Sequence, residues 1–264
     1  MNLSARVLGV GLVGPGLAGW RESRAALAGD SPYVPAPTAI PSPESLPPTE
    51  RRRAGKGVKL VLAAGLGACA DAGREARELA AVFTSSSGDG ENQHAICEVL
   101  ASPEREISPT RFHNSVHNAP AGYWGIATGA MAPSDSLAAF DASFAAGLVE
   151  ALGRLAADPS REVLVVAYDA PYPEPLRAAR PIADAFGVGL VLGPAPASAE
   201  GRLIEATFAR ETPTTLTDAA LESIRTGIPS ARGLPLLQLL ASGKPGRVVL
   251  EYLADLSLAI EVRA

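Results

Sequence analysis

Residues 136–151 change from a strand pattern to a helix pattern within a few positions. Four apolar residues, 137–140, are followed by Asp141 and then by Leu148 and Leu152, which lie one helical turn apart. A side chain at such an elbow stands above the edge of a sheet, at the positive end of the helix dipole. Many α/β enzymes use this position to hold a nucleophile or to bind an anion. The run therefore predicts an α/β fold in which a carboxylate, Asp141, occupies the position of a nucleophile.

The run Ser-Leu-Ala-Ala-Phe-Asp-Ala-Ser-Phe-Ala-Ala-Gly-Leu resembles the active-site elbow of β-ketoacyl synthases, condensing enzymes of the thiolase superfamily. In that family a Ser-Ile-Ala-Thr-Ala-Cys-Thr-Ser-Gly pattern carries the nucleophilic cysteine. Aligned without a gap, Ser136 and Ser143 match, Asp141 falls on the cysteine, and Phe144 falls on the glycine. A carboxylate is a far poorer acyl acceptor than a thiolate, and Phe144 would crowd the acyl entrance. The run is therefore more similar to the chain-length factors of arylpolyene-type pathways, the non-catalytic partners of a true ketosynthase.

A second stretch, 107–130, combines a proline-bounded segment with aromatic residues and histidines. His113 and His117 are four residues apart and would share one face of a helix. A metal site needs a third ligand, which does not follow at helical spacing, so loop histidines that form hydrogen bonds are the favoured interpretation. In β-ketoacyl synthases the matching Pro-x-x-Phe loop approaches the acyl pocket of the partner subunit. The resemblance thus implies a set of tunnel or interface residues: Phe112, His113, Phe140, Asp141, Ser143 and Phe144.

The rest of the chain alternates between strand and helix patterns. The resemblance implies a thiolase-like layered α/β fold with a mixed sheet, in which the first repeat is complete and the second is shortened. One domain is expected over residues 1–264, with a long helix from an N-cap at Thr49 to Gly73. Further strands are expected at 3–13, 80–84, 136–140, 162–168, 183–192, 202–209, 247–253 and 256–262, and helices at 20–28, 91–100, from 120, after 141, at 218–225 and at 234–240.

Charge and composition argue against several classes of partner. The net charge is −5 and the only basic run is 51–53, next to Glu50, so nucleic acid is not expected as a partner. No basic groove is evident, which would leave docking of an acyl carrier protein to the partner subunit. No apolar run is long enough to span a bilayer. Cys69 and Cys97 lie far apart and lack the further ligands of a zinc site, so free thiols, a cytoplasmic location and no cofactor are expected.

Three functions remain open from the sequence. Ketosynthases carry two catalytic histidines in their second half, whereas His94, His113 and His117 all precede Asp141. The resemblance therefore implies a non-catalytic, chain-length-factor-like subunit that pairs with a ketosynthase and shapes its acyl tunnel in arylpolyene, fatty-acid or polyketide extension. The alternatives are a stand-alone acyltransferase or hydrolase that uses Asp141 with His113 or His117, and a homodimer that binds an acyl chain without chemistry.

Two physical expectations accompany these hypotheses. A half-fold is expected to expose apolar surface that a complete fold would cover, and this surface would favour association. If Asp141 is a structural residue, it is expected to cap the helix that follows it by accepting backbone amide hydrogen bonds.

Overall fold

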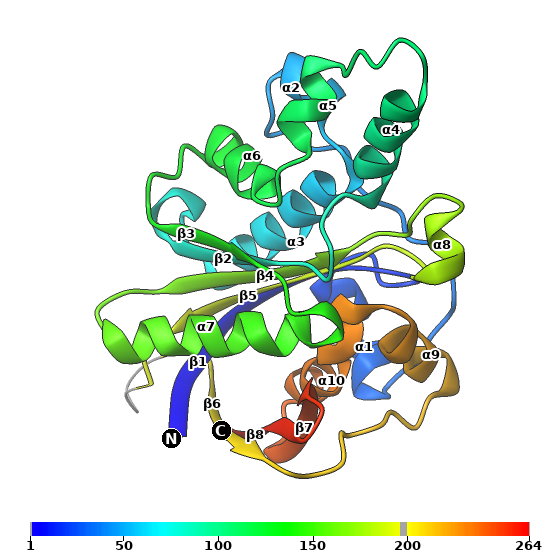
Figure 1. Cartoon of the computed structure of the whole chain (residues 1–264). Coiled ribbons are helices and arrows are strands. Elements are labelled where there is room, and N and C mark those ends of the chain that lie inside the picture. The colour runs from blue at the N-terminus through cyan, green and yellow to red at the C-terminus, as the bar shows by residue number, and fades with distance from the viewer. Residues whose placement is uncertain (1, 196–199, 264) are drawn as a thin grey trace.

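The computed structural model describes residues 2–195 and 200–263, which form a mixed β-sheet flanked by helices (Figure 1). The eight strands of these residues are β1 (Asn2–Val13), β2 (Ala80–Thr84), β3 (Ser134–Leu137), β4 (Val163–Asp169), β5 (Phe186–Gly193), β6 (Arg202–Ala209), β7 (Gly246–Leu253) and β8 (Leu256–Arg263). They lie in the order β3-β2-β4-β5-β1-β6-β8-β7. β2 runs parallel to β3 and β4, and every other pair of neighbours is antiparallel.

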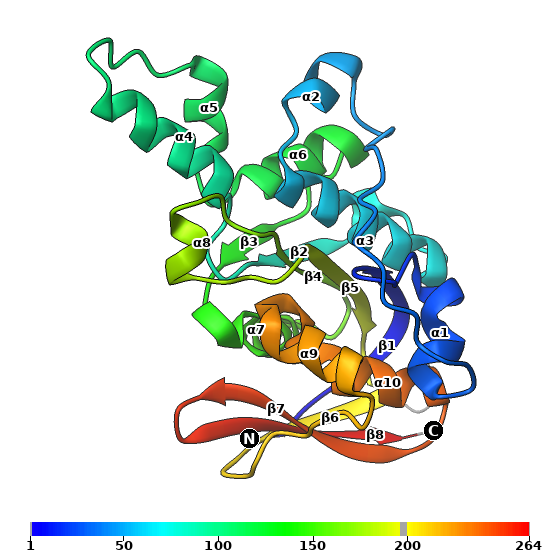
Figure 2. The same cartoon turned by 90° about the vertical axis from the view of Figure 1, so that its right-hand side faces the viewer.

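The long first strand joins two parts of the sheet. Residues 6–13 of β1 pair with β5 and residues 2–7 pair with β6, with a register shift between Val7 and Gly9. On the β6 side of β1 the sheet bends away from β2–β5, so that β6, β8 and β7 form a second layer of strands (Figure 2). β1 therefore couples the first repeat to the strands that remain of the second.

Helices cover the first layer of strands on both faces. On one face lie α3 (Lys56–Ala72) and α6 (Ala119–Thr128), and on the other lies α7 (Ser143–Ala157), which contacts both β4 and β7 and so fills the space between the two strand layers (Figures 1 and 2). The further helices are α1 (Trp20–Ala28), α2 (Pro48–Arg53), η1 (Ala76–Glu78), α4 (Gly90–Ala101), α5 (Pro109–Asn114), η2 (Phe140–Ala142), α8 (Leu176–Ala179), α9 (Ala219–Gly227), η3 (Pro229–Gly233) and α10 (Leu234–Ser242). Among the described residues, every helix is too short or too polar to cross a lipid bilayer.

Two packing arrangements explain the position of α7 and α3. The inward face of α7 carries Leu148, Leu152 and Leu155, which are at most 3% exposed, and burial of each leucine contributes about 1.5–3 kcal/mol. α3 lies directly on β1, where a Cβ added to Gly11 would stand 1.9 Å from the carbonyl oxygen of Ala64. Glycine is therefore required at this position of β1 so that the helix can approach the sheet.

The predicted long helix from Thr49 to Gly73 is wrong in its first part. The structure has two helices, α2 and α3, separated by extended residues at Ala54 and Gly55, and the N-cap of α2 is Pro47. Gly55 disfavours a continuous helix, and it lies where a Cβ would stand 2.6 Å from the carboxylate of Asp89. A contact from a distant loop thus accompanies the break in the helix.

Two boundaries near the elbow also differ from the predictions. Pro109–Asn114 form the short helix α5, where a loop was expected. The strand predicted to reach Phe140 ends at Leu137, and Phe140 belongs to the single 3-10 turn η2 before α7. The other predicted strands and helices are confirmed, with ends that shift by up to about three residues, as is usual for sequence-based boundaries.

One row of side chains on the second layer of strands is charged. Glu205, Glu261 and Arg247 lie opposite one another in register across β6, β8 and β7. Arg247 pairs with Glu211 at 2.6 Å and with Glu261 at 2.9 Å, and Arg263 pairs with Glu205 at 2.6 Å. The same strands also present apolar side chains, since Phe208 of β6 is 40% exposed and Leu253 of β7 is 61% exposed.

Candidate functional site

The elbow between β3 and α7 holds Asp141 between two arginines. Arg180, which follows α8, places Nη2 2.6 Å from Asp141 Oδ1, and Arg232 of η3 places Nη2 3.4 Å from Oδ2. Both arginines are largely buried, and the Asp141 side chain is 39% exposed. At the position that the family's nucleophile holds, this chain thus has a carboxylate that forms two ion pairs.

These ion pairs belong to a larger group, the elbow cluster, formed by Asp141, Arg180, Arg232, Glu251, Arg225 and Glu222. Arg232 also pairs with Glu251, and Arg225 donates to Glu251 at 2.9 Å and to Glu222 at 2.7 Å. The hydrogen bonds from Arg225 lower the pKa of Glu222, and burial lowers the pKa of Arg232. Three carboxylates balance three guanidinium groups, so the cluster is electrically neutral and joins η2 to α9, η3 and β7.

The expectation that Asp141 caps α7 is wrong. The N-cap residue of α7 is Ala142, and no side chain caps that helix. Ser143 stabilises the turn instead, because its hydroxyl accepts from the N–H of Ala139 at 3.0 Å and donates to the carbonyl of Phe140 at 2.7 Å. Asp141 instead pairs with arginines that are distant in the sequence. Capping rules use only neighbouring residues, so they do not predict these pairs.

The two phenylalanines of the elbow have opposite environments. Phe140 is 60% exposed and adopts a φ of +52°, and the Arg180 guanidinium lies 3.6 Å from the centre of its ring. Phe144 is 3% exposed and packs against Gly233, where an added Cβ would stand 2.4 Å from its ring. Ser143 is fully buried. In the chain by itself, Phe140 and Asp141 reach the surface, whereas Ser143 and Phe144 lie inside.

An open hollow of about 600 Å³, here called the elbow hollow, begins at Asp141. Its walls are residues 210–213 on one side and the hairpin between β7 and β8 on the other, whose tip lies near the start of α7 (Figure 2). The hairpin contributes Tyr252, Leu253 and Leu256, and Leu253 is 61% exposed. An apolar molecule would find a partly apolar wall beside the elbow.

The predicted residues of the 107–118 segment lie on the other side of the sheet. α5 stands on the α3 face, and the elbow lies on the α7 face (Figures 1 and 2). Phe112 is 67% exposed, the His113 ring meets Tyr123 edge-on with 6.2 Å between the ring centres, and His117 lines a small pocket with Gly88. No interaction between Asp141 and a histidine occurs in the described part of the chain, so the alternative pairing of Asp141 with His113 or His117 is not assembled there.

The outer edge of β3 is open in the described residues, since β3 pairs only with β2. Large apolar side chains are exposed on the elements around it. Ile126 of α6 is 48% exposed and Met131, between α6 and β3, is 94% exposed. An unpaired strand edge beside exposed apolar side chains is suited to association with another chain.

The expectation that the chain has no basic groove is wrong. Basic side chains from α2, α3 and α5 surround a hollow of about 490 Å³, the basic hollow: Arg52, Arg53, Lys56, Lys59 and Arg111. The same hollow includes Asp89 and Glu91, and Glu91 pairs with Lys56 at 3.0 Å. Four of the five cations lie within residues 52–59, which overlap the basic run 51–53, and Arg111 joins them from a distant segment only in the folded chain.

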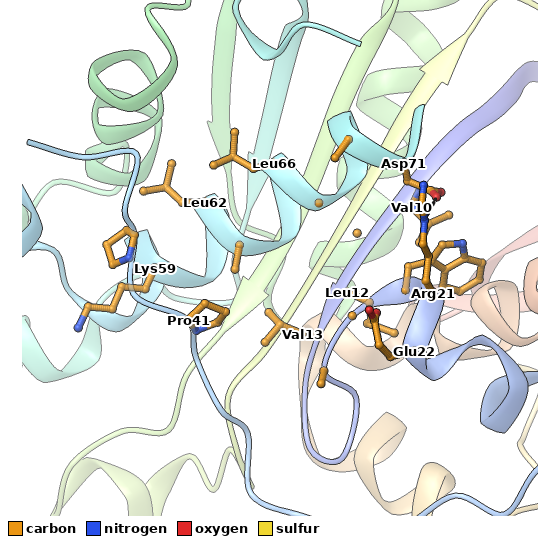
Figure 3. A pocket seen from close by; sticks show the side chains of 18 of the residues that line it. Val10, Leu12, Val13, Arg21, Glu22, Pro41, Lys59, Leu62, Leu66 and Asp71 are labelled. Atoms are coloured by element: carbon orange, nitrogen blue, oxygen red, sulfur yellow. Dashed lines mark hydrogen bonds and ion pairs between the residues drawn. The ribbon is translucent and has the colours of Figure 1, made fainter. Parts of the chain in front are cut away.

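Another hollow, of about 620 Å³, lies between α1, residues 41–45 and α3 (Figure 3). Asp71 at one end accepts from the N–H of Val10 at 3.0 Å and lies 3.6 Å from Arg21. Leu62 and Leu66 of α3 form an apolar wall, and Lys59 stands at the opposite end (Figure 3). None of the predicted site residues lines this hollow.

The layered arrangement, with the elbow at the start of the helix between the strand layers, is a thiolase-like fold. The family model described as "Beta-ketoacyl synthase, N-terminal domain" matches residues 20–243, and the chain belongs to this family. A search of the curated proteins found no match.

Three solved structures show how the chain compares with its relatives. A ketosynthase in complex with its chain length factor from Xenorhabdus doucetiae matches with a TM-score of 0.75 and 24% identity over 98% of this chain and 99% of the matched chain. A chain from the structure of a type II polyketide synthase acyl carrier protein in complex with its ketosynthase matches with a TM-score of 0.71 and 10% identity, over 100% of this chain and 100% of that chain. The ketosynthase from module 1 of the bacillaene synthase of Bacillus amyloliquefaciens matches with a TM-score of 0.59 and 15% identity over 81% of this chain but only 47% of its own. This chain thus matches the first two structures over nearly all of both chains, and the third over less than half of that structure's chain.

Proposed function

We propose that this chain is a non-catalytic, chain-length-factor-like subunit that pairs with a ketosynthase and shapes its acyl tunnel during arylpolyene, fatty-acid or polyketide extension. The observation that carries the proposal is the elbow, where the chain has no thiol and where the Asp141 carboxylate is paired with Arg180 and Arg232. A carboxylate in two ion pairs is a poor nucleophile and a poor general base. The condensing cysteine would therefore belong to the partner.

The open edge of β3 and the exposed side chains around it support the proposed pairing. Backbone N–H and C=O groups along Ser134–Leu137 are available to a strand of a second chain. Ile126 and Met131 supply apolar surface beside the strand, and Phe112 of α5 is available to approach the acyl pocket of the partner.

An acyl carrier protein is the proposed source of the growing chain. It would deliver the acyl group to the ketosynthase, and the basic hollow offers an acidic carrier an additional contact on this subunit. We propose a cytoplasmic location, because Cys69 and Cys97 are both free. The proposed role requires no metal or cofactor, and residues 1–264 are proposed to act as one domain.

Purification with the ketosynthase encoded beside this chain tests the proposal. We expect a stable complex that forms ketoacyl product from acyl and malonyl carrier proteins, whereas this chain alone forms none above background. Ketoacyl product made by the isolated chain would refute the non-catalytic role.

A matched pair of substitutions locates the interface. Ala138→Glu places a charge directly after β3 and is expected to weaken binding of the ketosynthase at least tenfold. Ala101→Glu, at an exposed position in the last turn of α4, is the control and is expected to leave binding unchanged. Equal effects of the two substitutions would show that the interface lies away from β3.

A further inference from the structure

The elbow holds an aromatic residue in a backbone conformation that favours glycine. Phe140 has a φ of +52°, in the left-handed region that bulky residues rarely adopt. Such strain persists only where the surrounding structure enforces it, and it concentrates at functional positions. A glycine would form the same turn without strain. The turn by itself therefore does not account for a phenylalanine at this position.

Both the backbone and the ring of Phe140 are held in place. The Ser143 hydroxyl bridges the N–H of Ala139 and the carbonyl of Phe140. The Arg180 guanidinium stacks on the ring at 3.6 Å and at the same time donates to Asp141 Oδ1 at 2.6 Å. One arginine thus fixes two consecutive residues of the elbow. The ion pair with Asp141 orients the guanidinium plane against the ring.

Phe140 remains 60% exposed in spite of these contacts. One face of its ring is covered by Arg180, so the exposed surface belongs to the rest of the ring. An aromatic ring that is already ordered loses little conformational entropy when it contacts an apolar ligand. Phe140 is therefore prepared to bind an apolar group.

We propose that Phe140 is the side chain with which this subunit limits the length of the acyl chain, and that Arg180 is the positioning residue that holds it. This inference rests on the proposed function, because the acyl chain reaches Phe140 only in the complex with a ketosynthase. The elbow hollow begins at the next residue, Asp141, and its partly apolar wall, with Tyr252 and Leu253, favours an acyl chain as the ligand beside Phe140. The neighbouring residue, Asp141, presents a carboxylate that is paired with Arg180 and Arg232, so Phe140 is the apolar side chain of the turn.

The experiment measures the lengths of the products made by the complex of this chain with the ketosynthase encoded beside it, supplied with acyl and malonyl carrier proteins. Phe140→Ala removes the ring and is expected to shift the main product to a longer chain by at least one extension unit. Phe140→Tyr keeps the ring and is expected to leave the main product unchanged. Leu100→Ala, at another exposed apolar residue (48% exposed, in α4), is the control and is expected to have no effect.

Two further variants separate positioning from stability. Arg180→Lys keeps a cation beside Asp141 but lacks the planar group that stacks on the ring, so it is expected to broaden the products toward longer chains. Phe140→Gly removes the ring and also relieves the strained φ, so it is expected to lengthen the products without lowering the melting temperature of the complex.

Each outcome decides the proposal. Complexes with Phe140→Ala that assemble and make products of the original length would overturn it, and so would a loss of assembly, which would make Phe140 an interface residue instead. A wild-type chain that does not pair with the ketosynthase would overturn the proposed function together with this inference.

Discussion

Asp141→Asn tests whether the elbow carboxylate acts through its charge. Asparagine has the shape of aspartate and caps helices about as well, so a cap would leave stability unchanged. In the structure, however, the two carboxylate oxygens accept from Arg180 at 2.6 Å and from Arg232 at 3.4 Å. Asparagine removes the negative charge and directs an amide group toward one of the two guanidinium groups. The substitution is therefore expected to lower the free energy of unfolding.

The magnitude follows from the geometry of the two contacts. A hydrogen bond between charged groups contributes about 1.5–3 kcal/mol. The contact of Asp141 with Arg232 at 3.4 Å is long, and the 39% exposure of the Asp141 side chain lets solvent screen both pairs. We therefore expect Asp141→Asn to cost about 1–2 kcal/mol. Asp141→Ala is expected to cost a similar amount, because both variants lose the charge.

Urea unfolding at pH 7 of the wild type, Asp141→Asn, Asp141→Ala, Arg180→Gln and the double variant Asp141→Asn/Arg180→Gln measures these costs. The double variant is expected to be less destabilised than the sum of its single variants, and the cost of Asp141→Asn is expected to shrink at high salt. A different result would show a capping role and refute the ion-pair reasoning: a free energy of unfolding for Asp141→Asn within about 0.3 kcal/mol of the wild-type value, with a loss of about 1 kcal/mol for Asp141→Ala.

Three other substitutions or treatments give separate tests. Asp169 is buried and accepts hydrogen bonds from two backbone N–H groups and two serine hydroxyls. Asp169→Asn is expected to lower the free energy of unfolding by about 1–3 kcal/mol, because one backbone N–H would then face an amide NH2 group. An unchanged melting temperature would contradict this. Burial raises the pKa of Cys69 to about 12, so at neutral pH iodoacetamide is expected to modify exposed Cys97 and to reach Cys69 only after unfolding, as mass spectrometry would show. The pKa of Glu222 is lowered from 4.5 by hydrogen bonds from Arg225, so this pair stabilises the fold above pH 4.5 and is lost as the pH falls through the lowered pKa. Glu222→Gln is therefore expected to be less stable than the wild type at pH 7 and equally stable in acid, below the lowered pKa. A difference that persists in acid would argue against ionic pairing.

Elements with a clear local pattern were predictable from the sequence. Helix α1 ends at Ala28 because Gly29 follows it in the left-handed conformation, and both the pattern and the glycine are visible in the sequence. Strands β2 and β6 are short runs with a regular strand pattern, and their predicted bounds are confirmed.

Long-range contacts set the limits of such prediction. The break between α2 and α3 at Gly55 lies against Asp89, which is 34 positions away in the sequence. The partners of Asp141 are 39 and 91 residues away, at Arg180 and Arg232. A carboxylate at a helix start has the same local sequence whether it caps the helix or binds distant arginines. The role of Asp141 therefore becomes visible only in the folded chain.

The two-sided pairing of β1 also has a consequence for how the chain is made. Both partners of β1 are distant in the sequence, since Arg6 pairs opposite Gly193 in β5 and Asn2 pairs opposite Thr207 in β6. At a synthesis rate of roughly 5–20 residues per second, about 10–40 s pass between the emergence of β1 and that of β6 from the ribosome. During this time β1 has neither of its neighbours in the sheet. The nascent chain is thus expected to need protection of β1, by chaperones or by the helices that follow it, until β5 and β6 have been synthesised.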